Sequence, residues 1–495
     1  MTDRSPLRSD AFLFALALGL LTVLRLAVAA AIPVSPDEAY YWLWAQAPAA
    51  GYYDHPFMVA AWVHIGTALF GNTGLGIRLL GPISTALGSW AVLDAARSLG
   101  VGRGYGAAIL LNATLLFGAG SVLMTPDTPL LFFWILTLWA AARIAAGGSG
   151  WWWIVTGLAA GLAFDSKYTA ALLLAGIGLW ALLTPLGRRW LFHDIRPWLG
   201  LITALILFLP VILWNADHHW VSFAKQGGRT ADFHPARAVQ FLGELIGGQL
   251  GLATPIIFVL CAIGLWRATL TAVKTRDAAA GLLVATGVLP ALVFIQHALG
   301  DRVQGNWPEI IYPAAVIAAA ALPAAARWLK PGAILGFALT LIVYVQAIAS
   351  PLPLGGTEPT IRVLGGWPAL TRSAEAQAQT VGAQFIAVDE YGLGSELALR
   401  LPRALPVLAD DPRWQYFNLP GPATAGLPAG TTGLLIRTMR RRDAPDTAPW
   451  TSMRLLGTIA RGRHGRIGES YRLYAVTLGP NAPALLARLP SGASP

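Results

Sequence analysis

Long apolar segments separated by short polar turns occupy the first 350 residues of the chain. A helix that crosses a bilayer needs about 20 mostly apolar residues. Eleven segments fit this length, at about residues 11–32, 77–96, 104–123, 128–146, 151–165, 168–185, 197–214, 246–266, 278–298, 310–326 and 333–350. The apolar stretch 57–70 is too short to cross upright, so we place it as an interfacial helix inside the first loop. The pattern predicts a polytopic α-helical membrane protein with about eleven spans.

Basic residues gather in alternate turns between these segments, which fixes the expected orientation. Arg97, Arg143 and Arg188 mark three such turns, and short loops rich in Lys and Arg stay in the cytoplasm. The opposite loops hold carboxylates, histidines and aromatic residues instead. We therefore expect the chemically active groups on the extracytoplasmic face.

Hydropathy falls after residue 350, where "PLPLGGTEPT" is typical of a linker. The stretch "AQFIAVDEYGLGSELALRL" (383–401) predicts a short buried strand, a turn and a helix. "GLLIRTM" and "ESYRLYAVTL" predict further strands. We expect a transmembrane catalytic domain at 1–350, with a first extracytoplasmic loop at 33–76, and a small soluble α/β domain at 351–495.

The basic run "RTMRRRD" (437–443) lies within this C-terminal domain. We interpret it as a solvated surface, with contact to lipid phosphates as the alternative.

Composition supports a membrane protein and argues against other classes. The 495 residues are 55% hydrophobic and 12% charged, with a mean hydropathy of +0.57, whereas soluble domains carry about 25% charged residues. The net charge of +10 is explained by cytoplasmic loops, so we expect no nucleic-acid partner. The single cysteine, Cys261, lies in an apolar run and forms no intramolecular disulfide.

The first loop, "SPDEAYYWLWAQAPAAGYYDHPF", concentrates ionisable and aromatic residues just after the first apolar segment. Ser35 and Pro36 are typical of a helix start, so Asp37 and Glu38 have two interpretations. They are functional carboxylates, or they complement the positive end of that helix. Further along, Asp54 and His55 are candidates to bind a divalent metal, to orient a base, or to pair with another charge.

Later loops add further candidates, each with a structural alternative. Asp127 stands between two prolines at the edge of an apolar segment, where an ionisable group is a functional candidate by default; the alternative is a helix cap. Asp165 and Lys167 interrupt an apolar stretch; Lys167 either holds a lipid phosphate or extends to the bilayer surface.

Two more loops carry cations and aromatic groups. "WNADHHWVSFAKQGGRTADFHPAR" supplies Arg229, and "GDRVQGNWPEIIYP" supplies Arg302 and Trp307. They are suited to a phosphate and a sugar or isoprenoid, and interfacial anchoring is the alternative. Because nucleotide sugars are not available outside the cytoplasm, a sugar donor there would be carried by a lipid phosphate.

The motifs "PDEAYYWLWAQ", "GYYDHPFMVAAW", "TPDTPLLFFW", "DSKYTA", "WNADHHWVSFAKQ" and "NWPEIIYPA" resemble, in order and spacing, bacterial family-39-like membrane glycosyltransferases. This part of the GT-C superfamily includes protein O-mannosyltransferases and the aminoarabinose transferase of lipid A. The resemblance covers about the first 350 residues, and "VDEYGLGSELALRLP" is similar to the C-terminal domain of the same group.

The resemblance implies an inverting transferase that takes a sugar from a polyprenyl phosphate. By position, Asp37 matches the catalytic base, Asp54 and Asp127 match further acidic motifs, and Lys167 matches a phosphate contact. His55, Arg229 and Arg302 are expected to assist at the donor phosphate. Around them we expect a substrate pocket formed by Glu38, Tyr40, Tyr41, Tyr53 and Trp307.

The resemblance also implies the partners and leaves some open. We expect a polyprenyl-phosphate-linked sugar donor, an acceptor that is a lipid, a polysaccharide or a protein, and a location in the bacterial inner membrane. A divalent metal is optional rather than required, because the leaving phosphate is already an anion. Two alternatives are a transporter or flippase of lipid-linked sugars and a catalytically inactive envelope-assembly protein.

Overall fold

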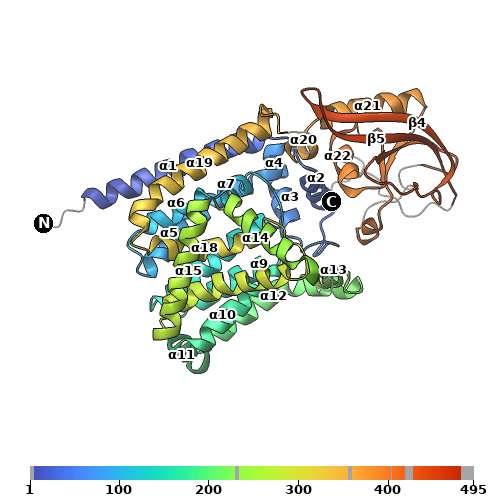
Figure 1. Cartoon of the computed structure of the whole chain (residues 1–495). Coiled ribbons are helices and arrows are strands. Elements are labelled where there is room, and N and C mark those ends of the chain that lie inside the picture. Colours follow the sequence, from blue (N-terminus) through green and yellow to red (C-terminus); the bar gives the residue numbers. More distant parts are fainter. Residues whose placement is uncertain (1–4, 229–233, 355–358, 403, 418–426, 481–495) are drawn as a thin grey trace. The chain divides into compact units, whose positions relative to one another are not determined.

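The computed structural model describes residues 5–228, 234–354, 359–402, 404–417 and 427–480 (Figure 1). Its internal contacts divide the chain into two compact units. The first comprises Met1–Ala29, Asp54–Trp62 and Arg78–Tyr344, and the second comprises Ala30–Tyr53, Val63–Ile77 and Val345–Pro495. The predicted first loop therefore contributes to both units.

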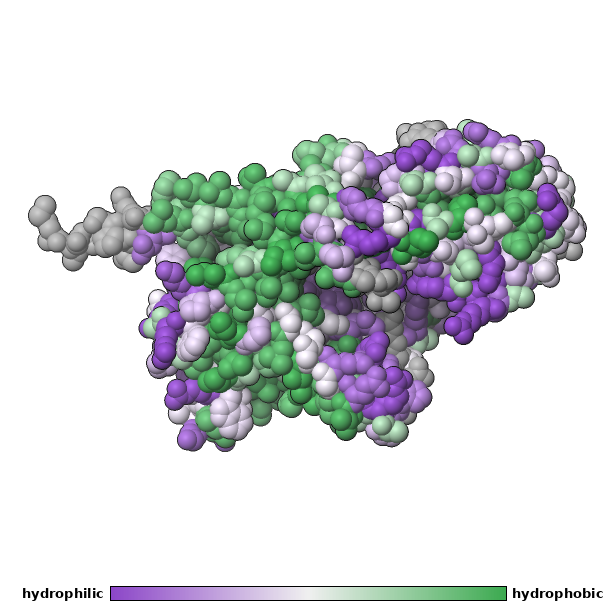
Figure 2. Space-filling view, turned by 45° about the horizontal axis from the view of Figure 1, so that its top comes forward, coloured by the Kyte–Doolittle hydropathy of each residue, from purple (hydrophilic) through white to green (hydrophobic). Residues whose placement is uncertain are grey.

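Seven helical stretches of the described chain are long and apolar enough to cross a membrane. They are α1 (Ser5–Ala31), α4 with α5 (Gly74–Arg78, Leu80–Ser98), α8 (Asp127–Ala145), α12 (Arg196–Asp217), α15 (Pro255–Thr275), α16 to α17 (Ala278–Leu283, a π-helical turn Val284–Val288, Leu289–Ala298) and α19 (Ala325–Ala349). Apolar residues cover much of the surface of these helices (Figure 2). The chain is a multi-span membrane protein.

Shorter helices complete the predicted membrane region. A pair bent by 97° joins Tyr168–Leu183 to α11 (Pro185–His193), and three apolar helices of 10–17 residues are Met58–Phe70 (α3), Trp152–Phe164 (α9) and Trp307–Ala320. The remaining helices of the first unit are α10 (Ala171–Leu183), α13 (Val221–Gly228), α14 (Ala238–Leu252), α18 (Tyr312–Ala320), and the 3-10 turns η1 (Tyr168–Ala170), η2 (Pro235–Arg237) and η4 (Trp307–Ile311). The predicted short helix at 57–70 is confirmed as α3.

Three predicted spans are interrupted in the structure, and one of them, 310–326, is divided between α18 and α19. The segment 104–123 is broken into α6 (Gly104–Asn112) and α7 (Leu115–Gly120), because Thr114 accepts a hydrogen bond from Phe117 N and caps a new helix. The segment 246–266 is broken between α14 and α15 at Thr254, whose φ is +67°. A residue before proline avoids helical geometry, so Pro255 starts a new helix inside a continuous apolar run.

Small residues allow the helices of the first unit to approach closely. A Cβ atom added to Gly157 of α9 would collide with the backbone of Gly200 in α12, and one added to Gly200 would collide with Trp153 O. Small residues at helix crossings let backbones approach and gain van der Waals contact where the hydrophobic effect is absent. The α9–α12 crossing is therefore set by two glycines.

The second unit contains a five-stranded sheet in the order β2-β1-β3-β5-β4. Strands β2 (Val407–Ala409), β1 (Phe385–Val388) and β3 (Thr432–Thr438) run parallel, and β5 (Arg466–Leu478) and β4 (Trp450–Arg463) form an antiparallel hairpin. Besides parts of α3, α4 and α19, this unit contains α2 (Pro36–Gln46), α20 (Pro359–Leu364), α21 (Trp367–Thr380), α22 (Tyr391–Arg400) and the 3-10 turn η5 (Pro412–Tyr416). The predicted strands at 383–388, 433–439 and 469–478 are confirmed, as is the helix after the first.

The tip of the β4–β5 hairpin caps the C-terminal end of α19. Arg463 donates to the carbonyl oxygens of Ala347 and Ile348, and Arg466 donates to Ser350 O at 2.6 Å. The last carbonyls of a helix lack intrahelical partners and carry a partial negative charge, so cations there are favourable. The hairpin is thereby attached to the segment that leads out of the last predicted span.

The interpretation of the run 437–443 as a solvated surface is wrong for its first residue. Arg437 is 1% exposed and forms ion pairs of 2.6 Å with Asp389 and with Asp443, whereas Arg440, Arg441 and Arg442 are exposed. Arg437 and Thr438 are both buried in the central strand β3, whereas the exposed arginines follow the end of that strand. The sequence run could not show that its first arginine faces acidic residues.

Replacing Arg437 should destabilise the C-terminal domain. Arg437→Ala removes one partner of a buried ion pair, a change that costs about 3 kcal/mol. We expect a lower midpoint in thermal unfolding of the detergent-solubilised full chain. Arg442→Ala, at an exposed position of the same run, is the matched control and should leave the midpoint unchanged; equal midpoints for both variants would contradict the burial argument.

Candidate active site

A buried ion pair joins two of the residues predicted from the sequence. Asp127 is the first residue of α8, and Lys167 lies in the extended link between α9 and η1. Lys167 Nζ lies 2.5 Å from Asp127 Oδ1, and the two side chains are 8% and 9% exposed. Lys167 therefore does not extend to the surface, and Asp127 pairs with a cation rather than capping its helix.

The turn η4 completes this cluster from a distant part of the chain. Asn306 Nδ2 donates to Asp127 Oδ2 at 2.8 Å, and Lys167 Nζ lies 5.7 Å from the centre of the Trp307 ring. Glu309 is 6% exposed, and its charge interacts with those of Asp127 and Lys167. We call Asp127, Lys167, Asn306, Trp307 and Glu309 the lysine cluster.

The lysine cluster is suited to bind an anion. An ammonium group has three N–H donors. Asp127 accepts one hydrogen bond from Lys167, which can therefore donate others. Asn306 fixes the second oxygen of Asp127, so the carboxylate holds the lysine in place. Since the cluster contains two carboxyl groups and one ammonium group, it is neutral when one carboxyl carries a proton. The chemistry available is electrostatic stabilisation of a negative group.

A second ion pair involves the first loop. Lys225 of α13 pairs with Asp54, and Gln226 Nε2 donates to the backbone oxygen of Asp54 at 2.7 Å. His55 follows at a half-buried position. Within the described residues, no group of three or more His, Cys, Asp and Glu side chains is placed to hold a metal ion. The structure therefore identifies Lys225 as a cationic partner of Asp54. The metal-binding role of Asp54 and His55 stays a prediction.

Of the two predicted arginines, Arg302 is described by the structure, and it pairs with a residue outside the lysine cluster. Arg302 forms a two-bonded ion pair with Glu244, at 2.6 and 2.9 Å, and its side chain is 56% exposed. Arg229 lies outside the described residues. No pattern in the sequence indicated that Arg302 would pair with Glu244, which lies 58 residues away.

In the second unit, α2 carries the predicted base. Ser35 caps α2 by accepting from Glu38 N, and Glu38 Oε2 accepts from Ser35 N at 3.0 Å. Glu38 is therefore a buried member of a capping box, as the structural alternative required. Asp37 is exposed, and the hydroxyl of Tyr391 in α22 donates to its Oδ1 at 2.8 Å.

The tyrosines that were predicted to line the substrate pocket pack against other side chains of the second unit. Tyr40 and Tyr41 are buried, and Tyr53 stacks on Tyr416 with ring centres 5.1 Å apart and planes 5° apart. Sequence reasoning identified these rings but missed Tyr391 and Tyr416, because the partners come from the other end of the chain. The motif "VDEYG" was the feature of the sequence from which Tyr391 could have been identified.

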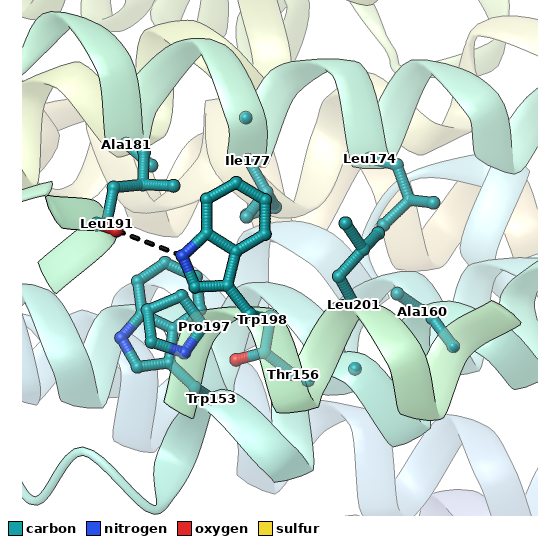
Figure 3. A pocket seen from close by; sticks show the side chains of 14 residues that line it. Trp153, Thr156, Ala160, Leu174, Ile177, Ala181, Leu191, Pro197, Trp198 and Leu201 are labelled. Carbon is teal, nitrogen blue, oxygen red and sulfur yellow. Dashed lines mark hydrogen bonds between the residues drawn. The ribbon is translucent and has the colours of Figure 1, made fainter. Parts of the chain in front are cut away.

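Two apolar pockets lie among the helices of the first unit. One, of about 130 Å³, is lined by α9, α10 and α12, with Trp153, Ile177 and Trp198 around it (Figure 3). The other, of about 260 Å³, is lined by α14, α15, α17 and the segment that follows Trp307, including Pro308 and Tyr312. Pro308 and Ile311 of this lining belong to η4, the turn that also carries Trp307 and Glu309 of the lysine cluster.

Comparison with known proteins places this arrangement in a class. Residues 54–214 match a family profile described as dolichyl-phosphate-mannose-protein mannosyltransferase. The lipid A galacturonosyltransferase RgtD of Rhizobium johnstonii is 27% identical over 388 residues, which cover 73% of this chain and 76% of that protein.

Solved structures show the same fold over the whole chain. ArnT from Cupriavidus metallidurans bound to undecaprenyl phosphate is 15% identical, covers 98% of this chain and 99% of its own, and has a TM-score of 0.61. Its apo state is 16% identical, with coverage of 95% and 98% and a TM-score of 0.62. The chain therefore has the GT-C fold of ArnT. Its sequence is similar to those of PMT/ArnT-like membrane glycosyltransferases.

The lysine cluster should show strong energetic coupling between its charges. Lys167→Met leaves two buried carboxyl groups without their cation, and we expect a loss of about 3 kcal/mol in the free energy of unfolding. Asp127→Asn in the same chain removes one carboxylate and keeps an acceptor for Asn306, so the double variant should recover most of that loss. Thermal unfolding of the single and double variants in detergent measures the coupling, and simple addition of the two losses would refute it.

Proposed function

We propose that the chain transfers a sugar from a polyprenyl phosphate to an acceptor hydroxyl on the extracytoplasmic face of the bacterial inner membrane. The observation that carries the proposal is the buried Lys167 ammonium group, held by Asp127 within a GT-C fold. An ionisable residue buried among membrane helices is costly and marks a functional site. A departing lipid phosphate is the anion that such a cation would stabilise.

In the proposed reaction, Asp37 takes the proton of the acceptor hydroxyl. The hydroxyl oxygen forms a bond to the anomeric carbon as the bond from that carbon to the phosphate oxygen breaks, which inverts the configuration. General-base help of this kind contributes roughly 10²–10⁴-fold. The lipid phosphate leaves with the bonding electron pair, and Lys167 balances its charge.

We assign the 260 Å³ pocket to the isoprenoid chain of the donor. Its walls are almost wholly apolar, and Pro308 and Tyr312 of the wall flank Glu309 of the lysine cluster. An apolar pocket near a buried cation is suited to bind a molecule with a hydrocarbon chain and a phosphate head group. The ArnT structure, which contains undecaprenyl phosphate, supports a polyprenyl carrier.

For the acceptor we propose lipid A, since the similar RgtD acts on lipid A, with galacturonic acid as the first sugar to test. The transporter alternative requires charges near the bilayer midplane in two matching halves. The assay is release of undecaprenyl phosphate from undecaprenyl-phosphate-linked sugars by the purified full chain. Release that requires lipid A supports the transferase; movement of the donor across vesicles without release would support the transporter.

Asp37→Asn should lower the rate of transfer about 10²-fold or more, because the amide does not accept the proton. Binding of undecaprenyl phosphate and the amount of folded protein should be unchanged. Asp446→Asn, at an exposed turn of the C-terminal domain, is the matched control. Full activity of Asp37→Asn would remove this residue from the mechanism.

Filling the second pocket should weaken donor binding. Ala262 lines that pocket from α15, and Ala262→Trp should raise the donor KM about 10-fold with a smaller change in kcat. Val259, on the same helix but 49% exposed and outside the pocket lining, gives the control Val259→Trp. If both variants leave the donor KM unchanged, the isoprenoid chain binds elsewhere.

A further inference from the structure

We propose that Tyr391 of the C-terminal domain is a positioning residue that orients the Asp37 carboxylate. This inference rests on the proposed function, in which Asp37 is the base. It gives the C-terminal domain a direct part in the reaction, which the motifs of the membrane region do not assign to it. The argument depends only on residues of the second unit.

The fold brings the two helix N-termini together. Strand β1 ends at Val388, and α22 begins at Tyr391, so this tyrosine stands at the carboxyl edge of the parallel strands. Helix α22 packs against α2. A Cβ atom added to Gly392 would lie 2.9 Å from Cβ of Pro36, the residue before Asp37. Only glycine permits this approach, which brings the Tyr391 hydroxyl within reach of Asp37.

The Tyr391 ring is held from two sides. Its centre lies 4.8 Å from that of Tyr40 in an edge-on contact, and the Arg413 guanidinium carbon lies 3.9 Å from the ring centre. Arg413 is itself fixed by Asp411, through its Nε at 3.0 Å. Cation–π and edge-on aromatic contacts each favour one ring orientation. The hydroxyl direction is thus set by groups other than Asp37.

A Tyr391 hydroxyl in a fixed position orients the plane of the Asp37 carboxylate that accepts its hydrogen bond. The Tyr391 hydroxyl donates to Oδ1 of the exposed Asp37 at 2.8 Å. A general base must lie within about 2.6–3.2 Å of the group whose proton it takes. A misplacement of about 1 Å lowers the rate about 10²-fold. Tyr391 therefore contributes to the rate without touching the substrate.

Tyr391→Phe tests this role, because it removes the hydroxyl and keeps the ring between Tyr40 and Arg413. In the assay of undecaprenyl phosphate release, we expect kcat to fall about 10-fold to 100-fold while the donor KM and the unfolding midpoint stay unchanged. Tyr474→Phe, on β5 against the core of the same domain, is the matched control and should retain full activity. In an Asp37→Asn background, Tyr391→Phe should cause no further loss.

Each outcome decides between separate claims. If Asp37→Asn is inactive and Tyr391→Phe is fully active, the positioning role is wrong and the proposed function stands. If Asp37→Asn is fully active, the proposed base is wrong and the inference falls with it. A rise in donor KM together with a lower unfolding midpoint in Tyr391→Phe would show a structural role and overturn the inference. An equal further loss in the Asp37→Asn background would also overturn it.

Discussion

The ion pair between Lys167 and Asp127 is the interaction on which the membrane part of the site depends. A single ammonium group buried among apolar helices is costly unless an anion compensates it. Asp127 supplies that compensation and Asn306 orients it, so the lysine side chain is held in place. The same arrangement gives the proposed donor phosphate a fixed cation instead of a mobile surface lysine.

The arrangement also explains why three distant segments must fold together. Asp127 opens α8, Lys167 follows α9, and Asn306 leads into η4. Each lies where a helix begins or ends, which is where backbone geometry allows a side chain to leave the helix surface. Helices α8 and α9, which carry two of these ends, pack directly against each other.

A similar division of tasks holds in the second unit. The capping box of Ser35 and Glu38 fixes the start of α2, which leaves the neighbouring Asp37 exposed. The sheet then presents Tyr391 from the end of β1. Of these two adjacent carboxylates, Glu38 stabilises the start of the helix, and Asp37 is the one that we propose as the base. This distinction follows from the position of each residue in the first turn and not from residue type.

The amino-acid sequence was sufficient to predict the membrane class, most spans, three of the five strands of the C-terminal domain, and Asp127 and Lys167 as unusual charges. Hydrophobic period and length carry that information locally. It did not determine the helix breaks at Thr114 and Thr254, which interrupt continuous apolar runs. The ion-pair partners of these charged residues became known only from the folded structure. They are Lys167 with Asp127, Arg302 with Glu244, and Arg437 with Asp389. These partners are 40 to 58 residues apart, and side chains that meet only after folding leave no periodic signal along the chain.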